Sequence, residues 1–134
     1  MGLVAIRAGL KTAFETVGGI GPVLMYPPKS IPANYTLFTG LNDFEVTRSG
    51  QMRAIRWGFT TRLVILWQDA ENAEAQLDAM VEAIIDAVDA DAHLGGALAS
   101  GIAQITAGDA DWFSIAGSEV VYRYVDFVVK VLEK

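Results

Sequence analysis

The residues with the clearest chemical potential are carboxylates that recur at helical spacing along one predicted helix and its end. They fall on one side, away from the apolar residues, and comprise Glu71, Glu74, Asp78, Glu82, Asp86 and Asp89. Like charges four residues apart cost about 0.2–0.5 kcal/mol per pair, and no nearby lysine offsets them. A carboxylate metal site of the helical-bundle type needs a Glu-x-x-His pair, which this sequence lacks. The acidic stripe is therefore either a solvated face or a surface that repels DNA or meets a basic partner.

A second group of candidate ligands follows that helix. Asp89, Asp91 and His93 have the alternate spacing of a calcium loop, but the EF-hand pattern fails because histidine stands at the third ligand position. His93 is the only histidine, and no G-x-S-x-G serine accompanies it. The absence of cysteine excludes disulfides, zinc–thiolate sites and thiol catalysis. We therefore expect no catalytic residue, no metal and no cofactor, and keep a small ligand- or metal-binding module around residues 89–93 as an alternative.

Basic residues are segregated from these acids. Residues 63–122 contain eleven acidic side chains and no lysine or arginine. Such a segment disfavours binding to nucleic acid, which requires clustered lysine and arginine, and equally disfavours an anionic membrane. Arg48, Arg53, Arg56 and Arg62 lie on a predicted hairpin, where they form either an ordinary exposed sheet face or a contact with an acidic neighbour.

The acidic helix of a second copy is the natural partner for that hairpin, in a head-to-tail contact that generates rings. This hypothesis names a set of subunit-interface residues on the two surfaces: Arg48, Gln51, Arg53, Arg56, Trp57, Glu74, Asp78 and Glu82.

The hairpin leads into the strand that organises the chain, residues 53–67. Its odd positions, from Trp57 to Trp67, form a mostly apolar face, as in a half-buried strand. Fifteen extended residues span about 50 Å, whereas a globule of this size has a diameter of only about 36 Å. The strand must therefore bend at Gly58, or its first half must project and meet another subunit.

The remaining elements are read from periodicity, glycine and proline. We predict helices at 3–17 and 69–88, the latter capped by Asp69, and an extended connector at 18–34 with one short strand at 23–26. Further strands are expected at 35–40, 44–47, 101–106 and 118–132, with turns at 48–51 and 108–111 and a short extended piece at 112–116. This order predicts a single α+β domain over residues 1–134, with an antiparallel-rich sheet, a long β-hairpin and two α-helices packed on one face.

Composition points to a covered surface. Hydrophobic residues make up 52% of the chain and charged residues 19%, against roughly 25% charged residues in ordinary domains. This surplus of hydrophobic over charged residues suggests that a partner covers part of the surface. An alanine-rich monomer is the alternative. The first helix carries Arg7, Lys11 and Glu15 among its apolar residues, so it does not read as a signal peptide, and no run approaches the roughly 20 apolar residues that span a bilayer.

Taken together, these parts resemble the tail terminator proteins of long-tailed bacteriophages, with the related tail-completion and neck proteins. The likeness rests on the order of elements over nearly the whole chain. It also rests on short matches: Tyr26-Pro27-Pro28, Ile31-Pro32, Trp67-Gln68-Asp69, Leu94-Gly95-Gly96, Ile115-Ala116-Gly117, Tyr122 and Tyr124.

The resemblance implies a non-enzymatic virion protein that assembles in the host cytoplasm. Its subunits would form a homohexameric ring on the last ring of the tail tube, stop polymerisation of the tube protein and dock the head-completion or connector protein. DNA would pass through the ring without specific binding, and no membrane would be involved. A head-completion or tube subunit of a related fold is the alternative within this class.

Overall fold

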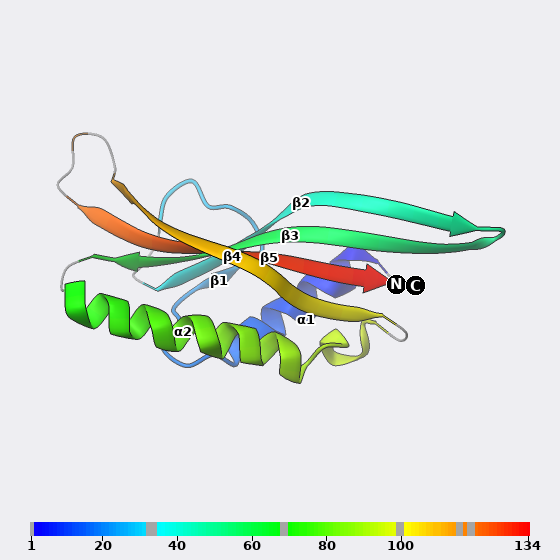
Figure 1. Ribbon diagram of the computed structural model, residues 1–134, viewed down its shortest axis with the longest axis horizontal. Coiled ribbons are helices and arrows are strands. Elements are labelled where there is room, and N and C mark those ends of the chain that lie inside the picture. The colour runs from blue at the N-terminus through cyan, green and yellow to red at the C-terminus, as the bar shows by residue number, and fades with distance from the viewer. Residues whose placement is uncertain (1, 32–34, 68–69, 99–100, 115–116, 118–119) are drawn as a thin grey trace.

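In the computed structural model, which describes residues 2–31, 35–67, 70–98, 101–114, 117 and 120–134, two α-helices lie against one face of a five-stranded sheet (Figure 1). The elements follow the chain in the order α1 (Leu3–Glu15), β1 (Val23–Leu24), β2 (Thr36–Ser49), β3 (Met52–Leu66), α2 (Ala70–Ala90), the short 3₁₀ helix η1 (Leu94–Gly96), β4 (Ile102–Ser114) and β5 (Val121–Glu133).

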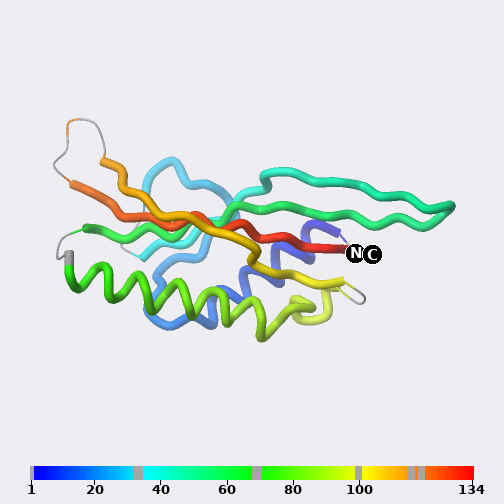
Figure 2. Tube along the Cα trace, in the orientation of Figure 1, coloured from blue at the N-terminus to red at the C-terminus, as the bar shows by residue number. Residues whose placement is uncertain are grey.

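The strands are arranged in the order β1-β2-β3-β5-β4. The short β1 runs parallel to β2, and the other neighbours are antiparallel. β5 lies between β3 and β4, so the two long strands anticipated from the sequence are central neighbours (Figure 2). The predicted α+β class, with an antiparallel-rich sheet covered on one face by both helices, is confirmed.

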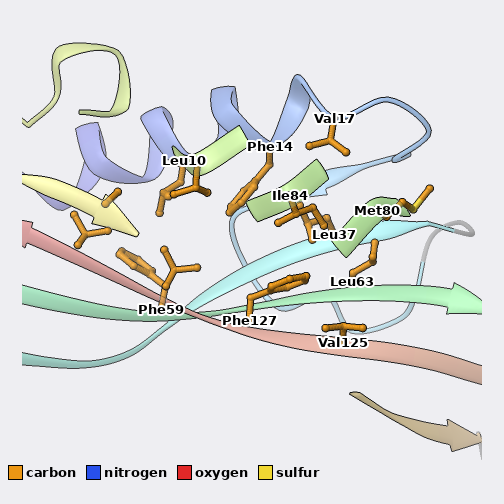
Figure 3. Packing of buried hydrophobic residues seen from close by; sticks show 14 of the residues in the cluster. Leu10, Phe14, Val17, Leu37, Phe59, Leu63, Met80, Ile84, Val125 and Phe127 are labelled. Atoms are coloured by element: carbon orange, nitrogen blue, oxygen red, sulfur yellow. The ribbon is translucent and has the colours of Figure 1, made fainter. Parts of the chain in front are cut away.

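The core forms where the helices meet the odd-numbered side chains of β3 and β5. Figure 3 shows Leu10 and Phe14 of α1 pointing toward the sheet, with Phe59 and Phe127 projecting from it. Each such side chain contributes about 1.5–3 kcal/mol on burial. The apolar side of α2 is buried at Ala73, Leu77, Met80, Ile84 and Val88, whereas Val81 and Ile85 are only partly buried.

Two threonines share this face with the apolar residues. Thr39 and Thr61 are directly opposite each other on β2 and β3 and are fully buried. Their hydroxyl oxygens lie 2.9 Å apart, so one hydroxyl donates a hydrogen bond to the other within the core.

The predicted break in β2 is wrong. The strand runs unbroken from Thr36 to Ser49, and its register with β3 shifts between Leu41 and Asp43. A β-bulge accommodates one extra residue without ending a strand, so the polar pair Asn42 and Asp43 marks a bulge and not a loop.

The predicted turn at residues 108–111 is also wrong. β4 continues through it to Ser114, with a register shift between Ile105 and Ala107. A Cβ added to Gly108 would lie 2.9 Å from the carbonyl oxygen of Asp126 on β5. Glycine here permits close approach of two strands, which local pattern does not distinguish from a turn.

Smaller differences concern the ends of elements. α1 ends at Glu15 and not at 17, α2 extends to Ala90, and β5 begins at Val121. The predicted cap Asp69 and residues 115–116 and 118–119 lie outside the described residues.

Candidate subunit interface

The outer part of the β2–β3 hairpin, which we call the arm (residues 43–57), projects from the molecule (Figure 1). β5 reaches β3 only as far as Ile55, which lies opposite Glu133, and β1 pairs only with Leu37 and Phe38. Toward the turn, β2 and β3 pair only with each other among the described residues. The ladder is continuous through Gly58, which pairs with Asp43 and Lys130. Of the two alternatives for the long strand, projection is the one observed.

Alternation of side chains gives the arm two different faces. Facing pairs on the side of the sheet that carries the helices are Phe44 with Trp57, Val46 with Ile55, and Arg48 with Arg53. The other side carries Glu45 with Arg56, Thr47 with Ala54, and Ser49 with Met52. The helix-side face is therefore apolar at its base and doubly basic near its tip.

The apolar part of that face is open to solvent. Phe44 is 63% exposed and Val46 is 40% exposed. The Phe44 ring lies 5.7 Å from the Trp57 ring, and the Trp57 indole donates to Oε1 of Glu133 at 3.3 Å. Trp57 is thus held at the base of the arm, and the neighbouring Phe44 ring is exposed to solvent.

The predicted basic cluster is not one patch. Arg48, Arg53 and Gln51 are exposed near the arm tip, whereas Arg56 is exposed on the opposite face beside Glu45. Arg62 lies in the body of the sheet, where its Nε and Nη2 donate to the two carboxylate oxygens of Asp126 at 2.7 and 2.9 Å. This hydrogen bonding to Asp126 raises the pKa of Arg62, and its guanidinium lies 4.1 Å from the Tyr124 ring. Arg62 is an internal ion-pair residue and not a free contact.

The acidic stripe of α2 is mostly free of internal partners on the described chain, with one exception. Glu71, Asp78, Glu82, Asp86 and Asp89 are exposed. Glu74 instead accepts a hydrogen bond from Nε of Arg123 on β5 at 2.8 Å. The predicted repulsion along the stripe is therefore relieved at Glu74, by an arginine of β5 and not by a lysine.

Sequence reasoning overlooked Arg123, although a signal was present. Arg123 occupies an odd position in β5, the parity of the apolar face, and its side chain is only 12% exposed. Its guanidinium lies 4.0 Å from the Trp112 ring, which packs edge-on against Trp67. A charged residue on the covered face of a strand requires an acid within reach, and α2 supplies Glu74.

Next to this ion pair, α2 and β4 enclose a groove of about 700 Å³. Its apolar lining includes Val81 and Ile85 of α2 and Ile105 of β4, with Val125 and Phe127 of β5 also lining it. Asp78, Glu82 and Asp109 add carboxylates to its lining. The space exists because the helix-side positions of β4 opposite Phe127 and Val125 are Gly108 and Ala110, whose small side chains cannot fill it. The groove is not predicted from the sequence, because the pattern at residues 108–111 indicates a turn.

Asp91 and His93 make local structural contacts. His93 Nδ1 lies 2.9 Å from the carbonyl oxygen of Gly101, and Asp91 Oδ1 accepts a hydrogen bond from the Gly95 amide at 2.8 Å. Within the described ranges, no group of three or more histidine, aspartate or glutamate side chains is placed to hold a metal ion. Among the same residues, no helix combines the length and the apolar character needed to span a membrane.

Comparison with solved structures relates this fold to a particle protein. One chain of a structure described as "Virion of native gene transfer agent (GTA) particle" superposes with a TM-score of 0.58 at 14% sequence identity. The match covers 96% of this chain and 94% of that chain. At this identity the likeness is one of fold. No protein-family model matches the sequence, and no curated protein matches it.

Proposed function

We propose that this chain is a structural protein of a phage-type virion and that it forms the terminator ring of the tail. The observation that carries the proposal is the complementarity of two separate surfaces. The arm carries Arg48 and Arg53 away from the body, while α2 carries Asp78 and Glu82 on a surface that the chain's own arm does not contact (Figure 1). Distinct, complementary surfaces make a heterologous contact, which closes into a ring when the rotation between copies allows it.

The fold likeness supports the class of particle. A chain with the same architecture over nearly its full length belongs to the gene transfer agent virion. The exposed apolar residues of the arm support assembly, because Phe44, Val46 and Met52 are all at least 40% exposed. Apolar side chains gathered on a projecting element are typical of surfaces that meet a partner.

In the proposed role the ring caps the tail tube, ends polymerisation of the tube protein and presents a surface to the head-completion or connector protein. DNA passes through the ring without specific binding, and the exposed acids of α2 outside the proposed subunit contact, such as Glu71 and Asp86, are suited to a surface that does not retain it. The role needs no catalytic residue. The protein would assemble in the host cytoplasm and remain in the virion at the neck.

Light scattering after size-exclusion chromatography, combined with negative-stain images of the protein with and without tail tubes, tests this function. A terminator should form rings of defined size, alone or on the end of a tube, and should not extend into filaments. Self-polymerisation into long tubes would assign the chain to the tube instead. A protein that stays monomeric and does not bind tube ends would overturn the proposal.

A further inference from the structure

We propose that the groove between α2 and β4 is the receptor for the arm of a neighbouring copy of this chain, with Phe44 and Val46 entering the groove. The inference rests on the proposed function in requiring self-assembly, and it specifies the surface through which the copies join. In this arrangement the arm contacts the apolar groove between α2 and β4 as well as the acidic side of α2.

The groove has the chemistry of a site for an apolar insert. Val81, Ile85 and Ile105 are partly buried, so each keeps apolar surface in contact with solvent. Gly108 and Ala110 leave the space above the buried Phe127 and Val125 unfilled by the protein's own side chains. One end is bounded by the ion pair of Glu74 and Arg123. An apolar occupant without acidic charge suits this lining, because Asp78, Glu82 and Asp109 would repel a carboxylate.

The helix-side face of the arm has that character. Phe44 and Val46 alternate along β2 and point to the same side, and each is at least 40% exposed. The arm's other face at the same level presents Glu45 and Thr47, which do not suit an apolar lining. Only one face of the arm therefore fits the groove.

Charge fixes the orientation of the inserted face. Arg48 and Arg53 follow Phe44 and Val46 toward the arm tip on the same face. Asp78 and Glu82 are exposed acids of α2 that also line the groove. Once the apolar residues are seated, the two arginines can reach these acids. Glu74 is not their partner, because Arg123 already holds it.

The position of β4 adds a further reason for a contact on this side. β4 is the last strand in the sheet order, so one edge of Ile102–Ser114 has no neighbouring strand among the described residues. Proteins usually cover or otherwise protect an edge of such length. An arm seated in the groove lies beside this edge and covers it.

Disulfide trapping tests the inference without background, because the chain contains no cysteine. Val46→Cys and Ala110→Cys are prepared separately, mixed, assembled into rings on tail tubes and oxidised. A disulfide forms only when the two Cβ atoms come within about 4.5 Å, so the mixture should give a cross-linked dimer. Thr47→Cys replaces Val46→Cys in one control and places the thiol on the other face of the arm. Ala79→Cys replaces Ala110→Cys in the second control, since Ala79 is exposed on α2 but does not line the groove.

The expected result is a dimer band for the first mixture and loss of that band in both controls. Rings without the dimer, or equal dimer in the controls, would overturn the groove as receptor while leaving the ring function in place. Failure of the wild-type protein to assemble at all would overturn both. Circular dichroism of each variant before mixing shows that its fold is intact.

Discussion

Arg48 and Arg53 lie directly opposite each other on the helix-side face of the arm, one residue pair before the pair that flanks the turn. Like charges in directly opposed positions of an antiparallel pair destabilise it. Both side chains are exposed near the tip, where the described chain offers no carboxylate in an ion pair with either. The arm thus retains an unfavourable pair that an acidic partner would convert into a favourable one.

Charge reversal on the arm should separate assembly from folding. Arg48→Glu with Arg53→Glu should raise the protein concentration needed for ring formation by about 30-fold or more, since losing an interfacial charge pair costs about 2 kcal/mol or more and 1.4 kcal/mol is ten-fold. The thermal midpoint of the unassembled protein should stay within a few degrees of wild type, because neither side chain contacts the core. Light scattering over a dilution series and thermal melts measure the two quantities.

The matched control is Arg56→Glu, which reverses a charge on the same strand but on the other face of the arm. It should leave the assembly concentration near the wild-type value. If Arg56→Glu weakens assembly as much as the double reversal, the proposal that only the helix-side face of the arm makes the contact is wrong. Restoration of assembly when the double variant is mixed with Asp78→Arg and Glu82→Arg protein would identify the acidic partners directly.

The inward-facing Arg123 should matter for stability. Arg123→Ala removes the hydrogen bond to Glu74 and the contact with the Trp112 ring. Because a hydrogen bond to a charged group contributes about 1.5–3 kcal/mol and Glu74 keeps 40% exposure, we expect a loss of about 1–2 kcal/mol in the free energy of unfolding. Urea denaturation followed by tryptophan fluorescence measures it.

Glu74→Gln provides the comparison for Arg123. It keeps an oxygen acceptor for Arg123 Nε while removing the charge, so the loss should be smaller, about 0.5–1 kcal/mol. An equal loss for both variants would mean that charge and not hydrogen bonding and packing dominates at this site.

The bidentate pair of Arg62 and Asp126 should be sensitive to geometry and insensitive to pH. Arg62→Lys keeps a positive charge but loses the planar fork that donates two parallel hydrogen bonds, and we expect a loss of about 0.5–1 kcal/mol on this partly exposed sheet face. The pKa of Arg62 is raised by Asp126. A group with a raised pKa contributes stability at all pH values below its unfolded-state pKa and loses it only above, which for arginine is far above neutral.

The wild-type free energy of unfolding should therefore show no step from Arg62 between pH 6 and 9. Urea titrations at several pH values for wild type and Arg62→Lys test this expectation. A difference between the two proteins that grows or shrinks across that range would show that a group other than Arg62 governs the pair.

Helices and strands with a regular pattern of apolar residues were predictable from the sequence. Features that depend on contacts with neighbouring strands were not. The apolar alternation of Phe59, Leu63 and Ile65 and the helical stripe of α2 specify which side is buried, so β3, α2 and the fold class follow. The bulge at Asn42 and the course of β4 through Gly108 depend on neighbouring strands, which no local pattern reports. The arrangement of the predicted interface residues could not be predicted for the same reason. Only the strand register places Arg48 and Arg53 on one face of the arm and Arg56 on the other.

Substitutions at Gly108 and Gly58 test whether Gly108 lies in a turn or allows two paired strands to lie close together. At Gly108 an added Cβ would lie 2.9 Å from the backbone carbonyl oxygen of Asp126, which cannot move without shifting β5. Gly108→Ala should therefore lower the free energy of unfolding by about 1–3 kcal/mol through overpacking. At Gly58 the nearest atoms belong to the side chains of Asp43 and Lys130, which form an exposed ion pair at 3.5 Å and can rotate away.

Gly58→Ala should accordingly cost less than Gly108→Ala, about 1 kcal/mol or below, because its cost is limited to an exposed ion pair and is partly offset by the lower entropy of the unfolded chain. Urea denaturation of the two variants side by side provides the measurement. A turn at 108–111 would predict the reverse order, since alanine in an open turn displaces nothing, whereas alanine at Gly58 must displace the Asp43 and Lys130 side chains. The order of the two losses therefore decides whether Gly108 lies in a strand paired with β5.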